Sequence, residues 1–413
     1  MRFSTSVIGI LSVVLFTRCN ETGHEFHLSG DSSWEAGVEV EKGVWLPFPF
    51  QLHLQPDTLI ELRFGEEVIR VDEVKLMPDS FFIRLPLYDS EIRGKRKEGE
   101  AGLNGRWYNL SRGKDYILPF RATLVQKEEI KPLPHADYTG RWKVVFNETA
   151  PDAYNAIGEF QQSGGTLSGT FLTETGDYRY LTGEATDSGF TLSRFDGAHA
   201  FLFACRLEKD GSLSGTYWSG IHSKETWKAV RDDTFQLGNA DSLTYLKEGY
   251  DRLAFTFPDL EGHLVSMSDP AFQNKVVIVQ LMGSWCPNCI DESKFLKEMY
   301  ERYHDRGLEV VALCFERTDE FEKAVRNVNR IRERLSIPYR FLIAGTADKN
   351  AASAALPMIN RVMAFPTAIV VARDGRVHEI HTGFSGPGTG IHYMDYKEKT
   401  DAMLQELLAQ GTP

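Results

Sequence analysis

The sequence predicts an α/β domain at its C-terminal end, with a mixed central sheet flanked by helices, preceded by a mostly antiparallel β region. Short apolar runs of β-forming residues, separated by turn residues, fill the chain up to about residue 231. After about residue 240, strand patterns alternate with helix patterns. A chain of 413 residues exceeds what one hydrophobic core usually organises, so we expect several domains.

Residues 1–19 have the pattern of an export signal. A charged start is followed by the apolar run Val7–Phe16, which is too short to span a bilayer. Cys19 follows this run closely, and its position resembles that of the lipidated cysteine in bacterial lipoprotein signals. The resemblance implies a periplasmic protein anchored to the membrane at Cys19. Arg18 stands where such signals have a small residue, so an ordinary signal with an incidental cysteine is the alternative.

Residues 24–130 are predicted to form a first β domain. Strand-like runs such as Ser80–Leu85 alternate there with turn residues. The segment 128–135, which contains Pro132 and Pro134, is predicted to be a linker.

Residues 137–232 are predicted to form a second β domain. The run Gly165–Phe171 returns in similar form as Gly211–Tyr217, and each copy has the pattern of a turn leading into a strand. Such repetition is typical of an antiparallel meander that closes into a small barrel or a sandwich. Neither β sequence contains a cluster of catalytic residue types, so we expect a spacer or docking role for both.

Residues 240–413 are predicted to form the α/β domain. Val276–Met282 is a continuous apolar run, as expected of a central strand buried on both faces. Asp374 and Gly375 give a strong hairpin signal between two later strands. A parallel β–α–β unit, an antiparallel hairpin and a closing helix together make a thioredoxin-like topology. In chain order we expect strands at 275–282 and 308–315, helices after residue 286 and at 319–335, strands at 339–344, 367–372 and 377–380, and a helix at 400–410.

Five cysteines are too few for a disulfide-built scaffold. Cys205 and Cys314 lie within apolar runs, where a cysteine packs as a small hydrophobic residue, so both are expected to be inert. Cys286 and Cys289 remain, spaced as Cys-x-x-Cys between a predicted strand and a predicted helix. This placement favours redox chemistry.

The predicted mechanism follows from that placement. With Cys286 at the N-terminus of a helix, unpaired amides and the helix dipole stabilise its thiolate and lower its pKa. Cys286 is therefore expected to be the attacking, partly exposed sulfur. Cys289, one turn further in, is placed to resolve the mixed disulfide, and Pro287 suits a first helical position. The Cys286–Cys289 disulfide is thus the expected redox group, and no separate cofactor or metal is predicted.

A structural zinc site is the alternative interpretation of the same spacing. Such a site needs four ligands, usually with a second Cys or His pair, and the sequence has no second Cys-x-x-Cys. Three downstream histidines keep the alternative open, namely His378, His381 and His392.

The run Trp-Cys-Pro-Asn-Cys, from Trp285 to Cys289, follows a buried strand and precedes Glu292. In this setting it resembles the TlpA/ResA-like branch of the thioredoxin superfamily. The segment from Phe257 to Asp269 is similar to the lead-in segment of that branch, and the resemblance covers about residues 255–408. It implies a thiol–disulfide oxidoreductase of exported proteins. The β region lies outside it and looks like the N-terminal modules that precede such domains in exported lipoproteins.

The resemblance also assigns residues around the cysteines. Pro366 matches the cis-proline of that branch, which lies opposite the cysteines and leaves the preceding backbone able to pair with substrate. A trans proline that merely begins a strand is the alternative. Ala364 stands where the branch commonly has glycine, and Phe365 is bulky, so the substrate preference is open. The expected neighbours of the substrate groove are Trp285, Pro287, Asn288, Phe365 and Thr367.

Glu292 matches the acidic residue three positions after the second cysteine in that branch, and this spacing puts it on the same helix face as Cys289. A partly buried carboxylate there can accept the proton of Cys289 during exchange. A solvated first-turn glutamate is the alternative, with Asp291 as its more exposed neighbour. Gln280 occupies the position where classical thioredoxins carry a buried aspartate, which makes Glu292 the better candidate base.

These patterns predict reductive dithiol–disulfide exchange on exported protein partners, supplied by a membrane or periplasmic redox donor. The net charge of −12 and the pI near 5.5 argue against a nucleic-acid binder. A thiol peroxidase is one alternative, which the tryptophan before Cys286 does not favour. The other is a ligand- or partner-binding lipoprotein whose thioredoxin-like domain is auxiliary.

Overall fold

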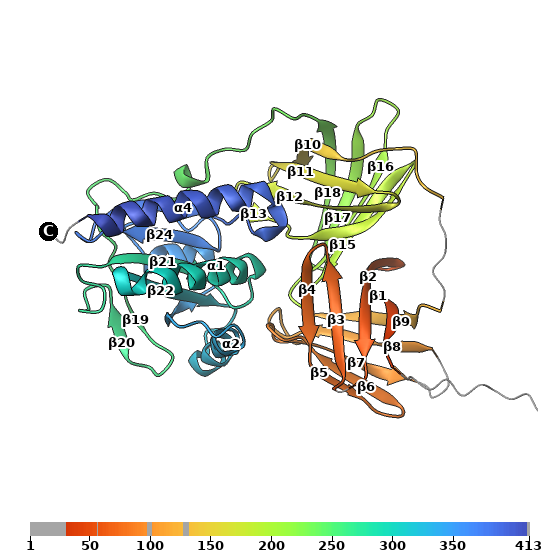
Figure 1. Cartoon of the computed structure of the whole chain (residues 1–413), viewed down its shortest axis with the longest axis horizontal. Coiled ribbons are helices and arrows are strands. Elements are labelled where there is room, and N and C mark those ends of the chain that lie inside the picture. The colour runs from red at the N-terminus through yellow and green to blue at the C-terminus, as the bar shows by residue number, and fades with distance from the viewer. Residues whose placement is uncertain (1–29, 56, 97–100, 127–131, 411–413) are drawn as a thin grey trace, which may run out of the picture.

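The computed structural model describes residues 30–55, 57–96, 101–126 and 132–410. The chain forms three parts, with the α/β part on the left of Figure 1 and two β parts on the right. The expected export segment 1–19, with Cys19, lies outside the described residues. Within those residues, we find no helix with the length and apolar character that a membrane span requires.

The first β part, which we call β module 1, is a nine-stranded sheet within the described ranges. Its strand order is β4-β3-β2-β1-β9-β8-β7-β6-β5, and all neighbouring strands are antiparallel. Buried and exposed residues alternate along β2, where Leu46, Phe48 and Phe50 face the core. The strands are β1 (Ser32–Glu41), β2 (Val44–His53), β3 (Leu59–Phe64), β4 (Glu67–Val71), β5 (Glu73–Leu76), β6 (Ser80–Arg84), β7 (Ser90–Arg96), β8 (Gly102–Asn109) and β9 (Ile117–Leu124).

The second β part, β module 2, is a closed barrel. Its order is β11-β10-β18-β17-β16-β15-β14-β12-β13, and an additional pairing of β11 with β12 closes the ring. Aromatic side chains such as Trp142, Phe171 and Phe203 are buried inside, so the interior is a packed core. The strands are β10 (Gly140–Phe146), β11 (Tyr154–Ser163), β12 (Thr166–Thr173), β13 (Gly176–Asp177), β14 (Leu181–Thr186), β15 (Gly189–Phe195), β16 (Ala200–Leu207), β17 (Leu213–Ser219) and β18 (Ser223–Arg231).

The α/β part has the thioredoxin-like topology that the sequence predicts. Its sheet runs β23-β22-β21-β24-β25, with β21, β22 and β23 parallel and the last two strands antiparallel. A short hairpin, β19 with β20, precedes it. The elements are η1 (Ala240–Ser242), β19 (Thr256–Pro258), β20 (Leu264–Ser266), β21 (Val276–Met282), α1 (Pro287–Tyr303), η2 (His304–Arg306), β22 (Leu308–Glu316), α2 (Phe321–Arg334), β23 (Arg340–Thr346), α3 (Lys349–Ala355), β24 (Thr367–Val371), β25 (Val377–Thr382), η3 (Pro387–Thr389) and α4 (Ile391–Ala409).

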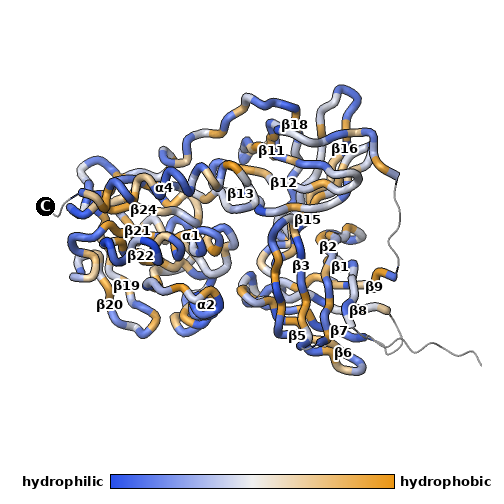
Figure 2. Tube along the Cα trace, in the orientation of Figure 1, coloured by the Kyte–Doolittle hydropathy of each residue, from blue (hydrophilic) through white to orange (hydrophobic). Residues whose placement is uncertain are grey.

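Strand β21 is buried along its whole length, as its apolar run predicts. Ile278 belongs to the core on the side of α1 and α4, whereas Val279 belongs to the core on the side of α3. Figure 2 shows the hydrophobic residues concentrated on such central strands. This rigid strand leads directly into the loop that carries the cysteines.

Two helices differ from the sequence prediction. Helix α4 begins at Ile391, well before the predicted start at Thr400, because Tyr393 and Tyr396 pack against Phe295 of α1. These tyrosines stand among charged residues, so no continuous apolar stripe marks the first half of the helix. Helix α3 was not predicted, since seven residues are too few to show a helical period.

Candidate active site

The two cysteines form a disulfide at the point where β21 passes into α1. Cys286 is the N-cap of α1, and its sulfur accepts a hydrogen bond from the backbone N–H of Cys289 at 3.2 Å. Pro287 occupies the first helical turn, where a missing N–H costs nothing. When the pair is reduced, the amino end of α1 stabilises a negative charge on Cys286.

The proline loop lies opposite the disulfide. The sulfur of Cys286 lies 3.5 Å from the carbonyl oxygen of Phe365, and the Phe365–Pro366 peptide bond is cis, the isomer that the resemblance implies. Thr367 differs from expectation. Its side chain is fully buried, and its hydroxyl donates to the carbonyl of Ala364 at 2.9 Å, so it supports the loop from below and does not border a groove.

Glu292 is enclosed beneath the disulfide with no measurable exposure. The side-chain amide of Gln280 donates to its Oε2 at 2.8 Å and to the carbonyl oxygen of Cys289 at 3.2 Å. The other carboxyl oxygen has no partner among the residues that the structure describes. Burial raises the pKa of Glu292 to about 8, and the hydrogen bond from Gln280 opposes that rise only weakly. This is a carboxyl group that exchanges a proton near neutral pH.

The loop before the cysteines is held from below by a residue that sequence patterns did not single out. Glu316, at the carboxyl end of β22, is buried and accepts from the backbone N–H of Ser284 at 2.7 Å and from its hydroxyl at 2.6 Å. Burial raises the pKa of Glu316, and the Ser284 hydrogen bonds act against this. The sequence signal that could have identified Glu316 is a charged residue at the end of an apolar strand.

Trp285 flanks the site and is partly exposed. Its Nε1–H donates to the carbonyl of Phe315 at 2.9 Å, and its ring meets the Phe365 ring edge-on with centroids 5.9 Å apart. The guanidinium of Arg317 lies over the indole at 4.2 Å, a cation–π contact that the sequence did not suggest. Burial lowers the pKa of Arg317 to about 10.

Two expectations about exposure are wrong. Cys286 was expected to be partly exposed, yet only 5% of its surface is accessible. Asp291 was expected to be the exposed neighbour of Glu292, yet it is buried and bound by Arg179 of β module 2. Burial alone would raise the pKa of Asp291, but Arg179 holds it below its usual value. β module 2 packs on this face of the α/β part, with Arg179 on Asp291 and Asp177 on Asn288, and these partners are too distant in sequence to be foreseen.

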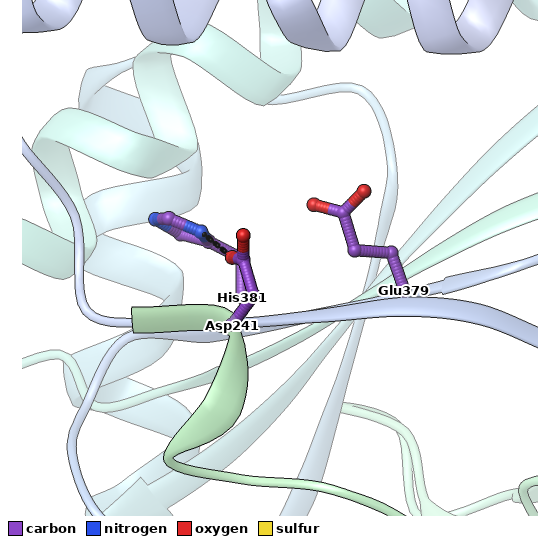
Figure 3. Close-up of side chains that lie close together, drawn as sticks. All are labelled: Asp241, Glu379 and His381. Atoms are coloured by element: carbon purple, nitrogen blue, oxygen red, sulfur yellow. Dashed lines mark hydrogen bonds and ion pairs between the residues drawn. The ribbon is translucent and has the colours of Figure 1, made fainter. Parts of the chain in front are cut away.

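The histidines of the zinc alternative lie apart from the sulfurs. His381 forms a hydrogen bond with Asp241 at 2.6 Å and, with Glu379, makes a three-residue group of possible metal ligands (Figure 3). His392 pairs with Glu159 of β module 2 at 3.0 Å. Neither arrangement includes Cys286 or Cys289, and sulfurs joined in a disulfide offer no thiolate to a metal.

Comparison with known proteins places the α/β part among redox proteins. The Redoxin family model matches residues 247–395. Thiol-disulfide oxidoreductase ResA of Bacillus thuringiensis subsp. konkukian is 28% identical over 159 residues, which are 38% of this chain and 75% of that protein. Thioredoxin-like protein YneN of Bacillus subtilis is 27% identical, over 33% of this chain and 73% of that protein. A secreted thiol-disulfide isomerase from Corynebacterium glutamicum, a solved structure, is 20% identical with a TM-score of 0.32, covering 43% of this chain and 99% of that one.

The sheet order, the Cys-x-x-Cys pair at a helix N-terminus and the opposed proline loop define the α/β part as a thioredoxin-like domain. This domain belongs to the TlpA/ResA-like branch of the thioredoxin superfamily. Its class of activity is thiol–disulfide oxidoreductase.

Proposed function

We propose that Cys286 is the nucleophile of this oxidoreductase and that Cys289 resolves the intermediate. The observation that carries the proposal is the sulfur of Cys286 at the N-cap of α1, 3.2 Å from the amide of Cys289. A thiolate at this position has a lowered pKa and is the reactive form in exchange. Cys289 is fully buried one turn further along, so it reacts only within the pair.

The exchange runs in two balanced steps. The Cys286 thiolate attacks one sulfur of the partner's disulfide, that S–S bond breaks, and a mixed disulfide forms while the other partner sulfur leaves and takes a proton. Cys289 then loses its proton to a base and attacks the sulfur of Cys286, which releases the partner's second sulfur as a thiolate that takes a proton from solvent. The partner gains two electrons and two protons, and the pair returns to the disulfide that the structure contains. A dithiol donor reduces the pair again.

Glu292 is proposed to take the proton that Cys289 loses. Gln280 links the two residues, since its amide contacts both the Glu292 carboxyl group and the Cys289 carbonyl. In the oxidised protein the pKa of Glu292 is about 8, so the group holds a proton at neutral pH. That is the state expected after the proton has moved from Cys289. When the disulfide is reduced, Glu292 returns this proton to Cys289.

The partners are proposed to be disulfides of exported proteins, and the donor a membrane or periplasmic dithiol. The export-signal pattern of residues 1–19 supports a location outside the cytoplasm, and Cys19 is the proposed site of a lipid anchor. Trp285, Asn288 and Phe365 surround the sulfurs and are the proposed contacts of the partner. Pro366 is proposed to present the neighbouring backbone to it.

The cysteine roles predict different outcomes for the two single variants. Cys286→Ser is expected to abolish insulin reduction, whereas Cys289→Ser should accumulate a mixed disulfide with the natural partner because the resolving thiol is gone. Mass spectrometry of the non-reduced adduct identifies the partner. Cys205→Ser, in β16 of β module 2, is the matched control and should retain full activity. Equal loss in both variants, with no adduct in either, contradicts the assignment.

A further inference from the structure

The β modules hold the first turns of the redox helix. Arg179, between β13 and β14, donates to both carboxyl oxygens of Asp291 in α1, at 2.7 and 2.8 Å. The two side chains are only 5% and 6% exposed. A bidentate pair of this kind fixes orientation as well as charge, and losing one partner leaves the other buried and uncompensated.

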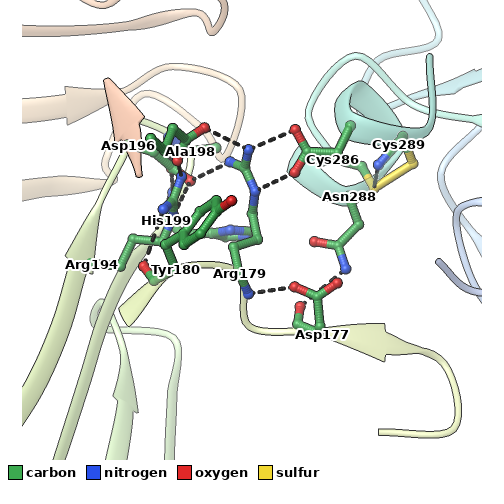
Figure 4. Close-up of polar contacts among 12 residues, drawn as sticks. Asp177, Arg179, Tyr180, Arg194, Asp196, Ala198, His199, Cys286, Asn288 and Cys289 are labelled. Atoms are coloured by element: carbon green, nitrogen blue, oxygen red, sulfur yellow. Dashed lines mark hydrogen bonds and ion pairs between the residues drawn. A yellow bond between two sulfur atoms is a disulfide. The ribbon is translucent and has the colours of Figure 1, made fainter. Parts of the chain in front are cut away.

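The same guanidinium joins all three parts of the chain. Figure 4 shows Arg179 beside Arg194 and Asp196. Arg179 also donates to Glu67 of β module 1 at 2.9 Å and to Asp196 of β module 2 at 3.2 Å. Arg194, which is fully buried, binds Asp196 at 3.1 Å and also binds Glu67. We call these four residues and Asp291 the clasp. Each of its three carboxylates contacts at least one guanidinium, and each of its two guanidinium groups contacts at least two carboxylates, so the loss of one member leaves a buried charge with fewer partners.

A second set of contacts covers the segment between the cysteines. The side-chain amide of Asn288 donates to the backbone carbonyl of Asp177 at 3.0 Å, and the carboxylate of Asp177 accepts from the N–H of Gly386 at 2.7 Å. Tyr88 of β module 1 and Ala198 of β module 2 belong to the same buried core cluster as Cys286. β module 2 therefore contacts the segment between the cysteines, and the buried core that contains Cys286 includes residues of both β modules.

This arrangement conflicts with the geometry of exchange. A disulfide of another protein must bring a sulfur into line with the sulfur of Cys286, and a residue that is 5% exposed offers no room for that approach. We propose that Arg179 is a positioning residue of the redox centre, which holds the β modules over Cys286, and that a protein disulfide reaches this sulfur only after the clasp releases. The inference rests on the proposed role of Cys286 as nucleophile.

A glycine offers a way to loosen the cover without touching a charge. A Cβ at Gly388, in η3, would lie 2.8 Å from backbone atoms of both Arg179 and Tyr180, which cannot rotate away. Gly388→Ala is therefore expected to push the α/β part away from β module 2. Gly165→Ala is the matched control, because a Cβ there meets nothing within 4 Å. Arg179→Met removes one of the two clasp cations, and Arg179→Lys retains a cation that cannot make the bidentate contact.

The test measures how fast iodoacetamide alkylates Cys286 in the reduced full chain across pH. The high-pH plateau of the rate reports access to the sulfur, and the midpoint reports the thiol pKa. We expect Gly388→Ala and Arg179→Met to raise the plateau by roughly tenfold, equivalent to about 1.4 kcal/mol in the closed-to-open equilibrium, with Arg179→Lys in between. Gly165→Ala should match the wild type. Insulin reduction should rise in the same order when access limits it.

Cys314 separates release of the cover from unfolding, because it is fully buried in β22 and reacts only if the domain opens. Peptide mapping should show label on Cys286 and none on Cys314. If Arg179→Met labels Cys314 as well as Cys286, that variant has unfolded, and the comparison then rests on Arg179→Lys and Gly388→Ala. Plateaus equal to the wild type in both of those variants overturn the clasp, even when insulin reduction through Cys286 persists. Reduction that survives Cys286→Ser overturns the proposed function instead.

Discussion

A carboxyl group enclosed without a cation keeps its proton to an unusually high pH, and Glu292 is such a group. Its neighbours are the amide of Gln280 and the hydrophobic core, so nothing near it favours the charged form strongly. Asp291, one residue earlier, is also buried but faces Arg179 and stays ionised. Two adjacent acids in one helix therefore have opposite protonation states at neutral pH, set by their surroundings.

This difference predicts a pH dependence of stability in the oxidised protein. Between the unfolded pKa of Glu292, about 4.5, and its folded pKa, about 8, the folded chain holds a proton that the unfolded chain releases. The contribution of Glu292 to the free energy of unfolding is therefore complete below pH 4.5 and declines, by a few kcal/mol in total, as pH rises to about 8. Glu292→Gln should abolish that decline. Urea unfolding of both proteins at several pH values measures it, and parallel pH profiles would contradict it.

Sequence patterns placed the proposed reactive residues close together but did not indicate what surrounds them. The spacing of Cys286, Cys289 and Glu292 is local to one helix, and the helix period alone brings the last two onto one face. The exposure of Cys286 and Asp291 depends on Arg179 and Glu67, which lie more than a hundred residues away along the chain. No local pattern reports a partner at that distance.

At the scale of elements, the loop from β21 to α1 is held at both ends. Its start is fixed by a buried strand, and its end is fixed by the N-cap. Glu316 supports the middle by accepting two hydrogen bonds from Ser284, so the carboxyl end of β22 sets where Trp285 and Cys286 begin. Strand β22 was predicted from its apolar residues, whereas the hydrogen bonds that its last residue, Glu316, accepts from Ser284 were not predicted.

Glu316 therefore provides a test of loop positioning. Glu316→Ala leaves the buried N–H of Ser284 without an acceptor, which should cost about 1–3 kcal/mol of stability and slow insulin reduction several-fold. Glu316→Gln keeps one acceptor oxygen and should stay within about twofold of the wild-type rate. Thermal melts and initial rates measure the two effects. The positioning role is contradicted if the alanine and glutamine variants are equally active.

At the scale of the whole molecule, the clasp joins the three parts of the chain, whose described interior residues form four hydrophobic clusters. Each β module has its own core, and the α/β part has one on each side of its sheet. The barrel form of β module 2 was within reach of the sequence because a meander of evenly spaced strands closes readily. The packing of β module 2 against the other two parts could not be predicted, because the contacts use isolated charged residues such as Arg194. In the sequence these look like any surface residue.

The clasp predicts that a substitution in α1 lowers the local stability of β module 2. Asp291→Ala removes one carboxylate from Arg179, which keeps Glu67 and Asp196, so we expect a loss near the lower end of that for a broken buried pair, about 3 kcal/mol. Backbone amides around Arg179 should then exchange with deuterium faster, although the substitution lies in another part of the fold. Asp305→Ala, an exposed aspartate in η2, is the control and should leave the barrel unchanged. Faster exchange confined to α1 in the Asp291 variant would show that the parts are mechanically independent.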